Sequence, residues 1–358
     1  MERELLRSAG HDVAIFERTN PVGAAKSLGA LMAAPWNPVT VSSINQLMAS
    51  TLPSVAHIHN TWFAISPAAL AATHRAGIPT VFTAHNYRLA CINGQLLRDG
   101  KPCQICVGTH PWAGVVYRCY RDSFLASSAA AGTLALNRRM GTWQKHVDVW
   151  IVLTTFMKEV LSATGIPGER IVHLPNFTFD PGPRSDPPSS SDTVLFVGRL
   201  SPEKGLEQLL ECWAQSPPKD LRLVIVGDGP LAPLLSGQDL PGVEFRGRLP
   251  QSEIRDLMLG ARALVVPSTW YEGQPMVVLE AMSAGLGVVA SDLGGLPETI
   301  GEGGQTVRSW FEFSFRDLID VDRLGRAARK RWSEVFTPER HLQGLMNAYD
   351  QAAYFHNR

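Results

Sequence analysis

The sequence predicts an α/β fold with two domains, each built around a parallel β-sheet. Short apolar or β-branched runs alternate along the chain with stretches of helical periodicity, a pattern typical of βαβ units. The chain has 358 residues, which is too long for one typical hydrophobic core. A stretch rich in Pro, Ser and Asp separates the two halves. Together these observations favour two sheet-and-helix domains over one.

The predicted strands are the apolar runs. They cover residues 55–58, 80–83, 149–152 and 171–174 in the first half, and residues 194–197, 221–226, 243–245, 263–266 and 287–290 in the second. Residues 1–7 are expected to end a helix, and residues 13–16 to form a further strand. Helices are expected between most strands. One example is the helical face shared by Leu206, Leu209, Leu210 and Trp213.

The domain boundaries follow from composition. Residues 1–175 are predicted to form the first domain and residues 193–336 the second, with an exposed linker at residues 176–192, NFTFDPGPRSDPPSSSD. Residues 337–358 predict a terminal helix that packs back on the first domain. Thr337 suits its N-cap and Pro338 its first helical position.

Charge and composition exclude some classes of protein. The 33 basic and 33 acidic residues balance, so nothing indicates a nucleic-acid-binding protein. The first residues, MERELLRSAGHDVAIF, lack the apolar core of a signal peptide. The longest weakly polar stretch, residues 124–136, is too short and too rich in Ser to span a bilayer. A cytoplasmic enzyme is therefore expected.

Two cations lie in one loop between a predicted strand and a helix. Arg199 and Lys204 follow the strand at residues 194–197, and ligands of open parallel sheets bind beyond the carboxyl ends of the strands. An Arg fork and a Lys point charge suit a diphosphate. Gly198 and Gly205 allow a close approach of backbone and ligand. The alternative is a pair of ordinary surface cations.

Two acids follow another strand end, in the stretch TWYEGQPMVVLEAMSAG. Glu272 lies in the loop, and Glu280 lies one turn into a helix that begins near Met276. Carboxylates accept hydrogen bonds from sugar hydroxyls, and the start of a helix attracts anions. A sugar, a diphosphate and a ribose fit such a row. The alternative is a capping acid and a solvated helix acid.

Five motifs in order resemble the retaining glycosyltransferases of family 4. They are the loop at residues 198–205, VIVGDGP, VEFRGRL, the two acids eight positions apart, and EAMSAGLGVVASDLGGLPE. In the first half, HIHNTWFAISP and TAHNYRLACINGQLLRDGKPCQIC resemble a bacterial subgroup that acts on polysaccharides and other surface glycans. The resemblance implies the GT-B fold, in which two Rossmann-like domains face a cleft. It also implies retaining transfer from a nucleotide-sugar donor to a glycan or lipid-linked acceptor.

The resemblance implies roles for individual residues. The catalytic residues would be His85 beside the transferred sugar, Arg199 and Lys204 on the donor diphosphate, and Glu272 on hydroxyls of the donor sugar. The donor-binding residues would be Gly198, Leu249 near the base, the backbone of Pro275, Met276 and Val277, and Glu280 on the ribose. Members of the family need no metal cofactor for catalysis, because cationic side chains replace it.

Two alternative functions remain open from sequence. Gly227, Gly229 and Ala232 fit the loose G-x-G-x-x-G/A pattern of NAD-dependent oxidoreductases, although they follow the second strand of their domain and not the first. The family's first strand and its glycine-rich loop would precede Met1, so the first domain is expected to lack its first strand. Such a chain is expected to bind nucleotide through its second domain but to be catalytically weak.

Four cysteines fall close together in the first half. Cys91, Cys103, Cys106 and Cys119 form the pattern C-x11-C-x2-C-x12-C. In a cytosolic protein this spacing favours a structural zinc site over disulfides, and four free or buried thiols are the alternative. Cys212 stands apart in a predicted helix and is expected in the core.

Basic residues flank the Ala-rich segment near residues 124–136. They are Arg118, Arg121, Arg138 and Arg139. One interpretation is contact with an anionic lipid-linked acceptor, and hence peripheral contact with the inner face of a membrane. The other is a set of solvated helix faces.

Overall fold

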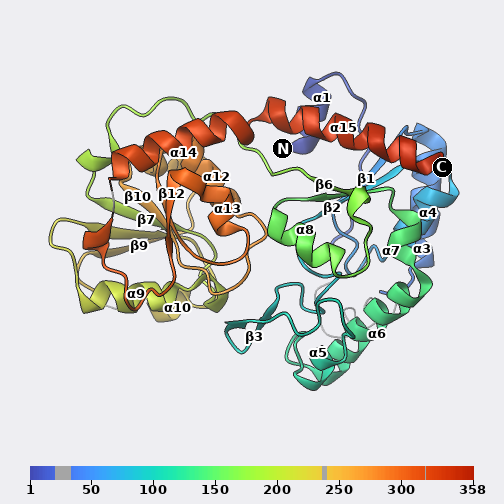
Figure 1. Ribbon diagram of the computed structural model, residues 1–358, viewed down its shortest axis with the longest axis horizontal. Coiled ribbons are helices and arrows are strands. Elements are labelled where there is room, and N and C mark those ends of the chain that lie inside the picture. The colour runs from blue at the N-terminus through green and yellow to red at the C-terminus, as the bar shows by residue number, and fades with distance from the viewer. Residues whose placement is uncertain (21–33, 236–239, 319) are drawn as a thin grey trace. The chain divides into compact units, whose positions relative to one another are not determined.

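The computed structural model of the chain describes residues 1–20, 34–235, 240–318 and 320–358 (Figure 1). These residues form two compact units. Unit 1 consists of Met1–Arg98, Cys103–Leu174 and Leu342–Arg358, and unit 2 of Asp99–Pro102 and Pro175–His341. Each unit contains a parallel sheet with helices, which confirms the predicted α/β class.

The sheet of unit 1 has four parallel strands in the order β1-β2-β5-β6. They are β1 (Ala56–Ile58), β2 (Thr80–Ala84), β5 (Val149–Val152) and β6 (Ile171–His173). The helices are α1 (Glu2–Ser8), α3 (Pro38–Thr51), α4 (Ala68–Arg75), α5 (Ala113–Val116), α6 (Phe124–Met140), α7 (Thr142–His146), α8 (Thr155–Ser162) and most of α15 (Pro338–His356). A small sheet pairs β3 (Leu97–Arg98) with β4 (Lys101–Pro102). The only 3-10 turn described in this unit is η1 (Gly168–Arg170).

Apolar side chains fix helices on the sheet of unit 1. Leu345, Ala348 and Ala352 of α15 pack against Val81 of β2 and Val149 of β5. A second cluster joins α3 and α4 through Ile44, Met48, Ala69, Ala72 and Ile78. The terminal helix thus belongs to the core of unit 1 although it is far away in sequence. None of the described helices is both long and apolar enough to cross a membrane.

The strand expected at residues 13–16 is wrong. These residues are described without strand structure, and Ile15 is 40% exposed. A strand needs a neighbour to accept its backbone hydrogen bonds. Among the described strands, β1 pairs only with β2 and lies at the edge of the sheet.

The sheet of unit 2 has six parallel strands in the order β12-β11-β10-β7-β8-β9. They are β7 (Thr193–Val197), β8 (Arg222–Val226), β9 (Val243–Gly247), β10 (Ala263–Val266), β11 (Val288–Ser291) and β12 (Gly304–Val307). The helices are α9 (Leu206–Gln215), α10 (Ala232–Leu235), α11 (Gln251–Gly260), α12 (Met276–Ser283), α13 (Leu296–Ile300) and α14 (Val321–Val335). Four 3-10 turns complete the described part: η2 (Pro188–Ser190), η3 (Pro202–Lys204), η4 (Gly301–Gly303) and η5 (Phe315–Asp317).

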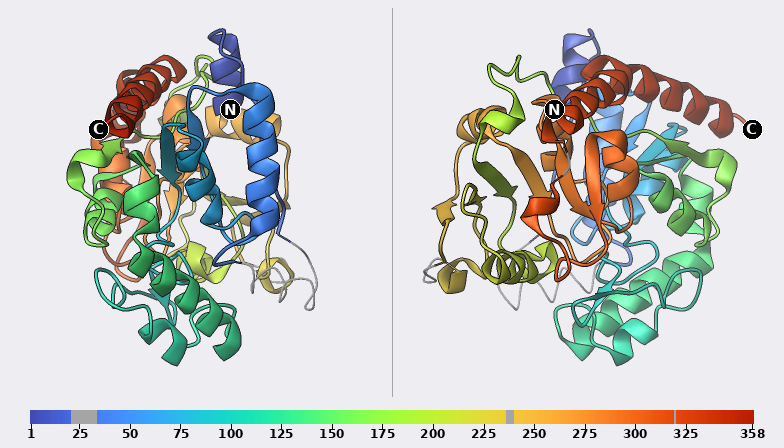
Figure 2. Two further views of the ribbon diagram at one scale, coloured as in Figure 1. Left: turned by 90° about the vertical axis from the view of Figure 1, so that its right-hand side faces the viewer. Right: turned by 60° about the vertical axis from the view of Figure 1, so that its left-hand side comes forward.

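Alternate side chains of these strands enter two separate cores. Leu195, Leu264 and Val288 face the layer that contains α11, α12 and α14. Val194 and Val265 face the layer that contains α9 and α10. The helices on the two faces can be followed in Figure 2. Burial on both faces is the usual environment of parallel sheets, and it holds the strand ends in place for a binding site.

The linker expected to be exposed is partly buried. Phe177 and Thr178 are 3% and 4% exposed. The indole Nε1–H of Trp332 donates to Oγ1 of Thr178 over 2.8 Å, and the Thr178 N–H donates to the Phe336 carbonyl over 3.1 Å. The prediction of exposure is wrong here because α14 offers an apolar surface and hydrogen-bond partners to this segment.

Candidate functional site: a strand-end crevice in unit 2

The strand order of unit 2 reverses direction between β7 and β10. From β7 the chain proceeds to β8 and β9 on one side, and it then returns to β10 on the other side. The loops that follow β7 and β10 therefore leave the sheet in opposite directions, and in open α/β sheets such a divergence forms a crevice at the carboxyl ends of the strands. Such a reversal is the usual ligand site of open α/β sheets. Both predicted motifs, the cationic loop and the acidic loop, lie here.

Backbone contacts bind these two loops together. The Thr269 N–H after β10 donates to the Glu203 carbonyl after β7 over 3.0 Å. Gly205 has a φ of +70°, and an added Cβ would lie 1.7 Å from the Pro267 carbonyl oxygen. Only glycine fits this position. The two loops thus hold each other in place.

An ion pair connects the two motifs. Nζ of Lys204 lies 2.7 Å from Oε1 of Glu272, whose side chain is only 5% exposed. The Ser268 hydroxyl donates to the same oxygen over 2.7 Å, and Nζ of Lys204 lies 5.5 Å from the centre of the Trp270 ring. The two charges are therefore in direct contact with each other, which the sequence did not predict.

The other predicted cation is accessible. Arg199 is exposed, and in the described residues no hydrogen bond or ion pair of its guanidinium is found. A Cβ added at the neighbouring Gly198 would meet nothing closer than 3.7 Å, at the Phe196 ring. The space beside Gly198 is thus open, and Arg199 is available to an anionic ligand.

The start of α12 follows the acidic loop. Pro275 is its N-cap without a side-chain cap, and the helix begins at Met276. The N–H groups of Met276 and Val277 lack intrahelical acceptors, as in the first turn of any α-helix. Pro275 itself has no N–H, and its carbonyl accepts from Val278 over 3.1 Å. Of the three predicted backbone positions, Met276 and Val277 can therefore donate to a phosphate.

The second predicted acid lies one turn further along α12. Oε1 of Glu280 accepts a hydrogen bond from Nε2 of Gln251 over 2.9 Å. Burial raises the pKa of Glu280, and the bond from Gln251 opposes this to a smaller extent. Leu249 precedes Gln251, is partly buried, and packs against the core under α12. The structure thus places Leu249 near the helix that carries Glu280.

The glycines of the GDGP loop have a packing role. A Cβ at Gly227 would lie 1.8 Å from the Gly198 carbonyl oxygen, and one at Gly229 would lie 2.4 Å from that of Leu200. The Leu200 N–H also donates to the Asp228 carbonyl over 2.9 Å. These glycines support the cationic loop from behind, which explains the pattern without a nicotinamide cofactor.

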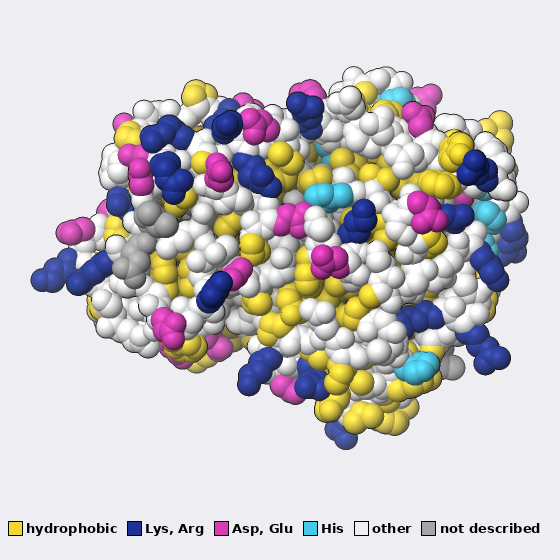
Figure 3. All heavy atoms as spheres, in the orientation of Figure 1, with side chains coloured by type: hydrophobic (Ala, Val, Ile, Leu, Met, Phe, Trp, Pro, Cys, Tyr) yellow, Lys and Arg dark blue, Asp and Glu magenta, His cyan; other side chains and the backbone are white. Residues whose placement is uncertain are grey.

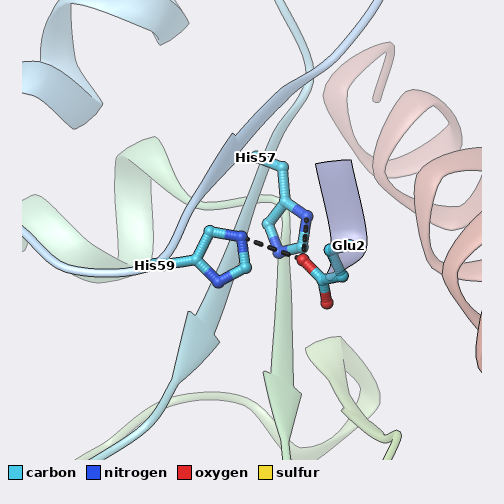
Figure 4. A group of neighbouring side chains, drawn as sticks. All are labelled: Glu2, His57 and His59. Atoms are coloured by element: carbon cyan, nitrogen blue, oxygen red, sulfur yellow. Dashed lines mark ion pairs between the residues drawn. The ribbon is translucent and has the colours of Figure 1, made fainter. Parts of the chain in front are cut away.

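The histidines of unit 1 form a chain of polar contacts. His59 follows β1 and His85 follows β2; Nδ1 of His59 lies 2.9 Å from Nε2 of His85. Nε2 of His59 lies 3.0 Å from a carboxylate oxygen of Glu2, and Figure 4 shows that both His57 and His59 are paired with this carboxylate. A carboxylate only accepts, so Nε2 of His59 donates to it. A neutral His59 then accepts at Nδ1 from His85, which leaves Nδ1 of His85 as an acceptor.

The environment keeps His85 neutral. Desolvation and, to a smaller extent, the neighbouring His59 lower the pKa of His85 to about 4, although part of its ring remains exposed. His85 also borders a cavity of about 50 Å³ within unit 1, together with His59, Asn60, Trp62 and Arg88. A neutral imidazole acceptor beside a partly apolar cavity suits a hydroxyl-bearing ligand.

Four of the five predicted cysteines belong to unit 1. Cys91, Cys103, Cys106 and Cys119 are unpaired and line a separate cavity of unit 1. Cys212 is 3% exposed, which confirms its predicted place in the core.

Several polar residues of the site did not stand out in the sequence. Ser268 and Trp270 precede Glu272, which they support, and their place in the polar stretch STWYE is the local signal that predicts them. Gln251 is 29 positions before Glu280, and no local signal connects the two. His59 lies in the motif HIHN, but its pairing with His85 depends on the register of β1 and β2.

Comparison with known families agrees with this geometry. The profile described as Glycosyltransferase Family 4 matches residues 3–178, and the one described as Glycosyl transferases group 1 matches residues 191–314. Together they span both units. Two units, each with a parallel sheet and helices, define an α/β protein with two Rossmann-like units. The chain belongs to family 4 of the glycosyltransferases.

Individual relatives are more distant. The chain is 38% identical over 185 residues to the sulfoquinovosyl transferase SQD2 of Arabidopsis thaliana, which covers 45% of this chain and 34% of that protein. It is 35% identical over 115 residues to a putative teichuronic acid biosynthesis glycosyltransferase, TuaC, of Bacillus subtilis, covering 32% and 28%. The chain thus matches about a third of the length of these curated relatives. A longer match, 26% identical over 330 residues and covering 84% of this chain and 69% of the relative, is to a D-inositol 3-phosphate glycosyltransferase of Rhodococcus erythropolis.

Solved structures share the fold. Sucrose-phosphate synthase of Thermosynechococcus elongatus matches with a TM-score of 0.68 at 19% identity, covering 97% of this chain and 90% of that one. Anabaena HepE in complex with UDP-glucose matches with a TM-score of 0.61 at 19% identity, covering 97% and 88%. These similarities show the GT-B fold, and the chemistry of this chain has to be argued from its own residues.

Proposed function

We propose that the chain is a retaining glycosyltransferase that moves a sugar from a nucleotide-sugar donor to a glycan or lipid-linked acceptor. The observation that carries the proposal is the strand-end crevice of unit 2. There the paired Lys204 and Glu272 and the accessible Arg199 lie on two connected loops. This arrangement offers both cations for a diphosphate and a carboxylate for sugar hydroxyls.

The donor-side roles follow from this charge arrangement. Arg199 and Lys204 neutralise the diphosphate, and they stabilise the charge that grows on it as the sugar leaves. The N–H groups of Met276 and Val277 add donors at the positive end of α12. Glu280 accepts from the ribose hydroxyls, and Leu249 offers an apolar contact for the base. Glu272 accepts from hydroxyls of the transferred sugar, held by Ser268.

The donor nucleotide is proposed to be UDP. HepE, whose fold the chain shares, is described in complex with UDP-glucose. Among the described residues, the apolar Leu249 is the only contact that we assign to the base. The binding test below therefore compares three bases.

The acceptor-side role is proposed for His85 of unit 1. Its Nδ1 is the acceptor that the chain of contacts from Glu2 through His59 leaves available. It can accept a hydrogen bond from a sugar hydroxyl and so orient the transferred sugar. The departing diphosphate, in front-face transfer, takes the proton of the attacking hydroxyl, so no protein base is needed for that step. The transfer needs no metal ion, as is general in family 4, and a zinc ion at the cysteine cluster would be structural.

Exposed side chains at α5 and at the start of α6 support the proposal that the acceptor is lipid-linked. Trp112, Val116, Phe124 and Leu125 are between 52% and 75% exposed. Lys and Arg side chains lie among hydrophobic ones over this part of the surface (Figure 3). Exposed apolar and basic side chains together favour contact with an anionic lipid surface, which would account for peripheral membrane contact at the inner face. Cosedimentation with vesicles of phosphatidylglycerol tests it: Phe124→Ser/Leu125→Ser should reduce binding at least tenfold, and equal binding would refute the assignment.

The donor test compares nucleotides and their sugars. Isothermal calorimetry with UDP, GDP and ADP, followed by their sugar conjugates, should show binding of one base, and we expect UDP. Saturation at about a hundred times the dissociation constant should add about 2.7 kcal/mol to the free energy of unfolding. Arg199→Ala should weaken that binding roughly tenfold or more, since a charge-assisted hydrogen bond contributes about 1.5–3 kcal/mol. Binding of no nucleotide, or of NADH alone, would overturn the proposal.

A further inference from the structure

Four cysteines of unit 1 share one small cavity. Cys91, Cys103, Cys106 and Cys119 all line it, and its volume is about 20 Å³. A cavity of about 10–15 Å³ already accommodates one water molecule. The space thus suits a single ion. Cys119 interacts electrostatically with each of the other three thiols, so the four form one group.

Turns deliver these thiols to the cavity. The Cys103 N–H donates to the Leu96 carbonyl over 2.7 Å, and the Cys119 N–H donates to the Gly114 carbonyl over 2.9 Å. A Cβ added at Gly114 would lie 2.6 Å from Cδ1 of Ile92. The helix α5 thus packs directly on the turn that follows the first cysteine. Segments separated in sequence meet at the cavity.

The surroundings are cationic. Burial raises the pKa of Cys119 and of Cys106, and Arg98 beside Cys119 and Arg138 beside Cys106 oppose this to a smaller extent. The Gly114 N–H also favours the thiolate of Cys106. Arg138 is held by the Leu89 carbonyl over 2.7 Å. Fixed guanidinium groups offset the negative charge that four thiolates around a divalent ion would carry.

Little regular structure holds this part of the chain. β3 and β4 have two residues each, and α5 has four. Of the seven described non-glycine residues with positive φ, five lie between positions 96 and 122: Leu96, Asp99, Arg118, Arg121 and Asp122. Left-handed backbone costs energy for such residues and persists only where the surroundings enforce it. A cross-link between the turns would supply that constraint.

We infer that Cys91, Cys103, Cys106 and Cys119 bind one zinc ion that holds residues 91–119 in shape. Binding converts one hydrated Zn²⁺ and four thiols into a tetrahedral tetrathiolate of charge −2, with release of four protons. Four thiolates at about 2.3 Å from the ion are the usual closed structural site. The four cysteines belong to unit 1 and the residues of the donor site to unit 2, so the inference does not rest on the proposed glycosyl transfer.

Two other described groups place three ligand atoms within 4.8 Å of one another: Glu2, His57 and His59, and His74, Asp148 and His356. The four thiols are more widely spaced than these, so zinc has to draw them together, and binding is coupled to closure of the turns. His57 already has hydroxyl partners at both ring nitrogens, Tyr349 at 2.9 Å and Thr83 at 2.7 Å. Among the described residues, each of the four thiols has fewer hydrogen-bond partners than the His57 ring. Sulfur is also the ligand that zinc prefers in closed sites.

Metal analysis of the whole purified chain tests the inference. Protein purified without chelators should contain about one zinc per chain by mass spectrometry. Cys103→Ser and Cys106→Ser should each lose most of that zinc. Cys212→Ser is the matched control, because Cys212 is a buried thiol of unit 2 whose Sγ contacts the Phe313 carbonyl, and it should keep its zinc. Cobalt replacement should give the visible bands of a tetrahedral thiolate site.

Thiol titration of the wild-type chain tests the inference even if the cysteine variants fail to fold. The wild-type chain has five cysteines, and all five should react after denaturation with chelator and without reductant. A single reactive thiol, that of Cys212, would mean two disulfides and would overturn the inference. So would absence of zinc and cobalt binding with all four thiols freely reactive in the native chain. Nucleotide binding by unit 2 should persist in Cys106→Ser, so failure here leaves the donor assignment separately testable.

Discussion

The ammonium group of Lys204 and the carboxylate of Glu272 are 2.7 Å apart, and the carboxylate is almost fully buried. In the chain as described, the cation assigned to the diphosphate thus compensates the acid assigned to the sugar. Donor binding has to share Lys204 between these two anions. Lys204 and Glu272 therefore differ from Arg199, whose guanidinium has no ion-pair partner among the described residues.

Lys204→Ala should therefore weaken folding as well as donor binding. It leaves Glu272 without its counter-charge, and removal of one partner of a fully buried pair costs about 3–5 kcal/mol. Because the Lys204 side chain is 23% exposed, we expect about 1–3 kcal/mol after screening by solvent. Arg199→Ala should weaken donor binding with no loss of stability. Urea unfolding and calorimetry measure the two effects.

A double variant separates the two roles of Lys204. In Lys204→Ala/Glu272→Gln the buried charge is gone, so most of the stability should return, while donor binding stays weak. If the double variant is as unstable as Lys204→Ala alone, the buried carboxylate is not the cause of the loss.

The two acids should differ in which ligand they affect. Glu280→Gln should weaken binding of the free nucleotide and of the nucleotide sugar alike, since its proposed partner is the ribose. Glu272→Gln should spare the free nucleotide and weaken only the sugar conjugate. Calorimetry with both ligands on both variants decides this. Equal losses throughout would contradict the division of roles.

Glu280 should also give a pH-dependent stability difference. Burial raises its pKa in the folded chain, so between the unfolded and the folded pKa the native state binds more protons than the unfolded state. Stability contributed by this group therefore falls as pH rises through that window. Glu280→Gln, without ligand, should gain stability relative to wild type from pH 4 to pH 7. Urea titrations at pH 4 and pH 7 measure the free energy of unfolding of the variant and of the wild type. If the value for the variant minus that for the wild type falls from pH 4 to pH 7, the assignment is contradicted.

A pair of glycines tests the connection between the loops. Gly205→Ala places a Cβ 1.7 Å from the Pro267 carbonyl oxygen at a φ of +70°. The left-handed backbone alone costs about 1–2 kcal/mol, and the clash forces the loops apart. Nucleotide affinity and melting temperature should both fall. Gly198→Ala is the control: it meets no atom closer than 3.7 Å and should keep the melting temperature. A stable Gly205→Ala chain with normal affinity would show that the loops are not held by this contact.

Removal of His59 should change the titration of His85. The pKa of His85 is lowered to about 4, first by desolvation and then by His59. In His59→Asn it should therefore rise toward its ordinary value, while His173→Asn, a control at the end of β6, should leave it unchanged. Proton NMR titration, with the His85 signal assigned by His85→Gln, measures the shift. An unchanged or lower pKa in His59→Asn would show that the two rings are not in contact.

Much of the unit 2 site was predictable because it lies at strand ends. Apolar runs mark β7 and β10, and the polar residues that follow them are placed by the sheet itself. The contact between Lys204 and Glu272 was not predictable, since it depends on β7 and β10 being neighbours although two other strands separate them in sequence. β12 was missed because its residues Gly304–Val307 contain one large apolar side chain and show no run.

Unit 1 departs further from expectation for a related reason. The run at residues 13–16 has strand-like composition, but local composition does not supply a neighbouring strand. The segment after Pro175 has loop-like composition, yet Phe177 is buried against partners far along the chain. In both cases non-local contacts decide the outcome over local preference.

The chain crosses between its two units at both ends of the short Asp99–Pro102 segment, after Leu174 and after His341. Nδ1 of His341 lies 2.8 Å from the Pro175 carbonyl oxygen, so the crossings after Leu174 and after His341 lie side by side. In unit 1, a Cβ added at Gly344 of α15 would lie 2.4 Å from Cδ1 of Leu174, so α15 packs closely against this residue. The His341 imidazole thus links two chain segments that lie 166 positions apart in the sequence.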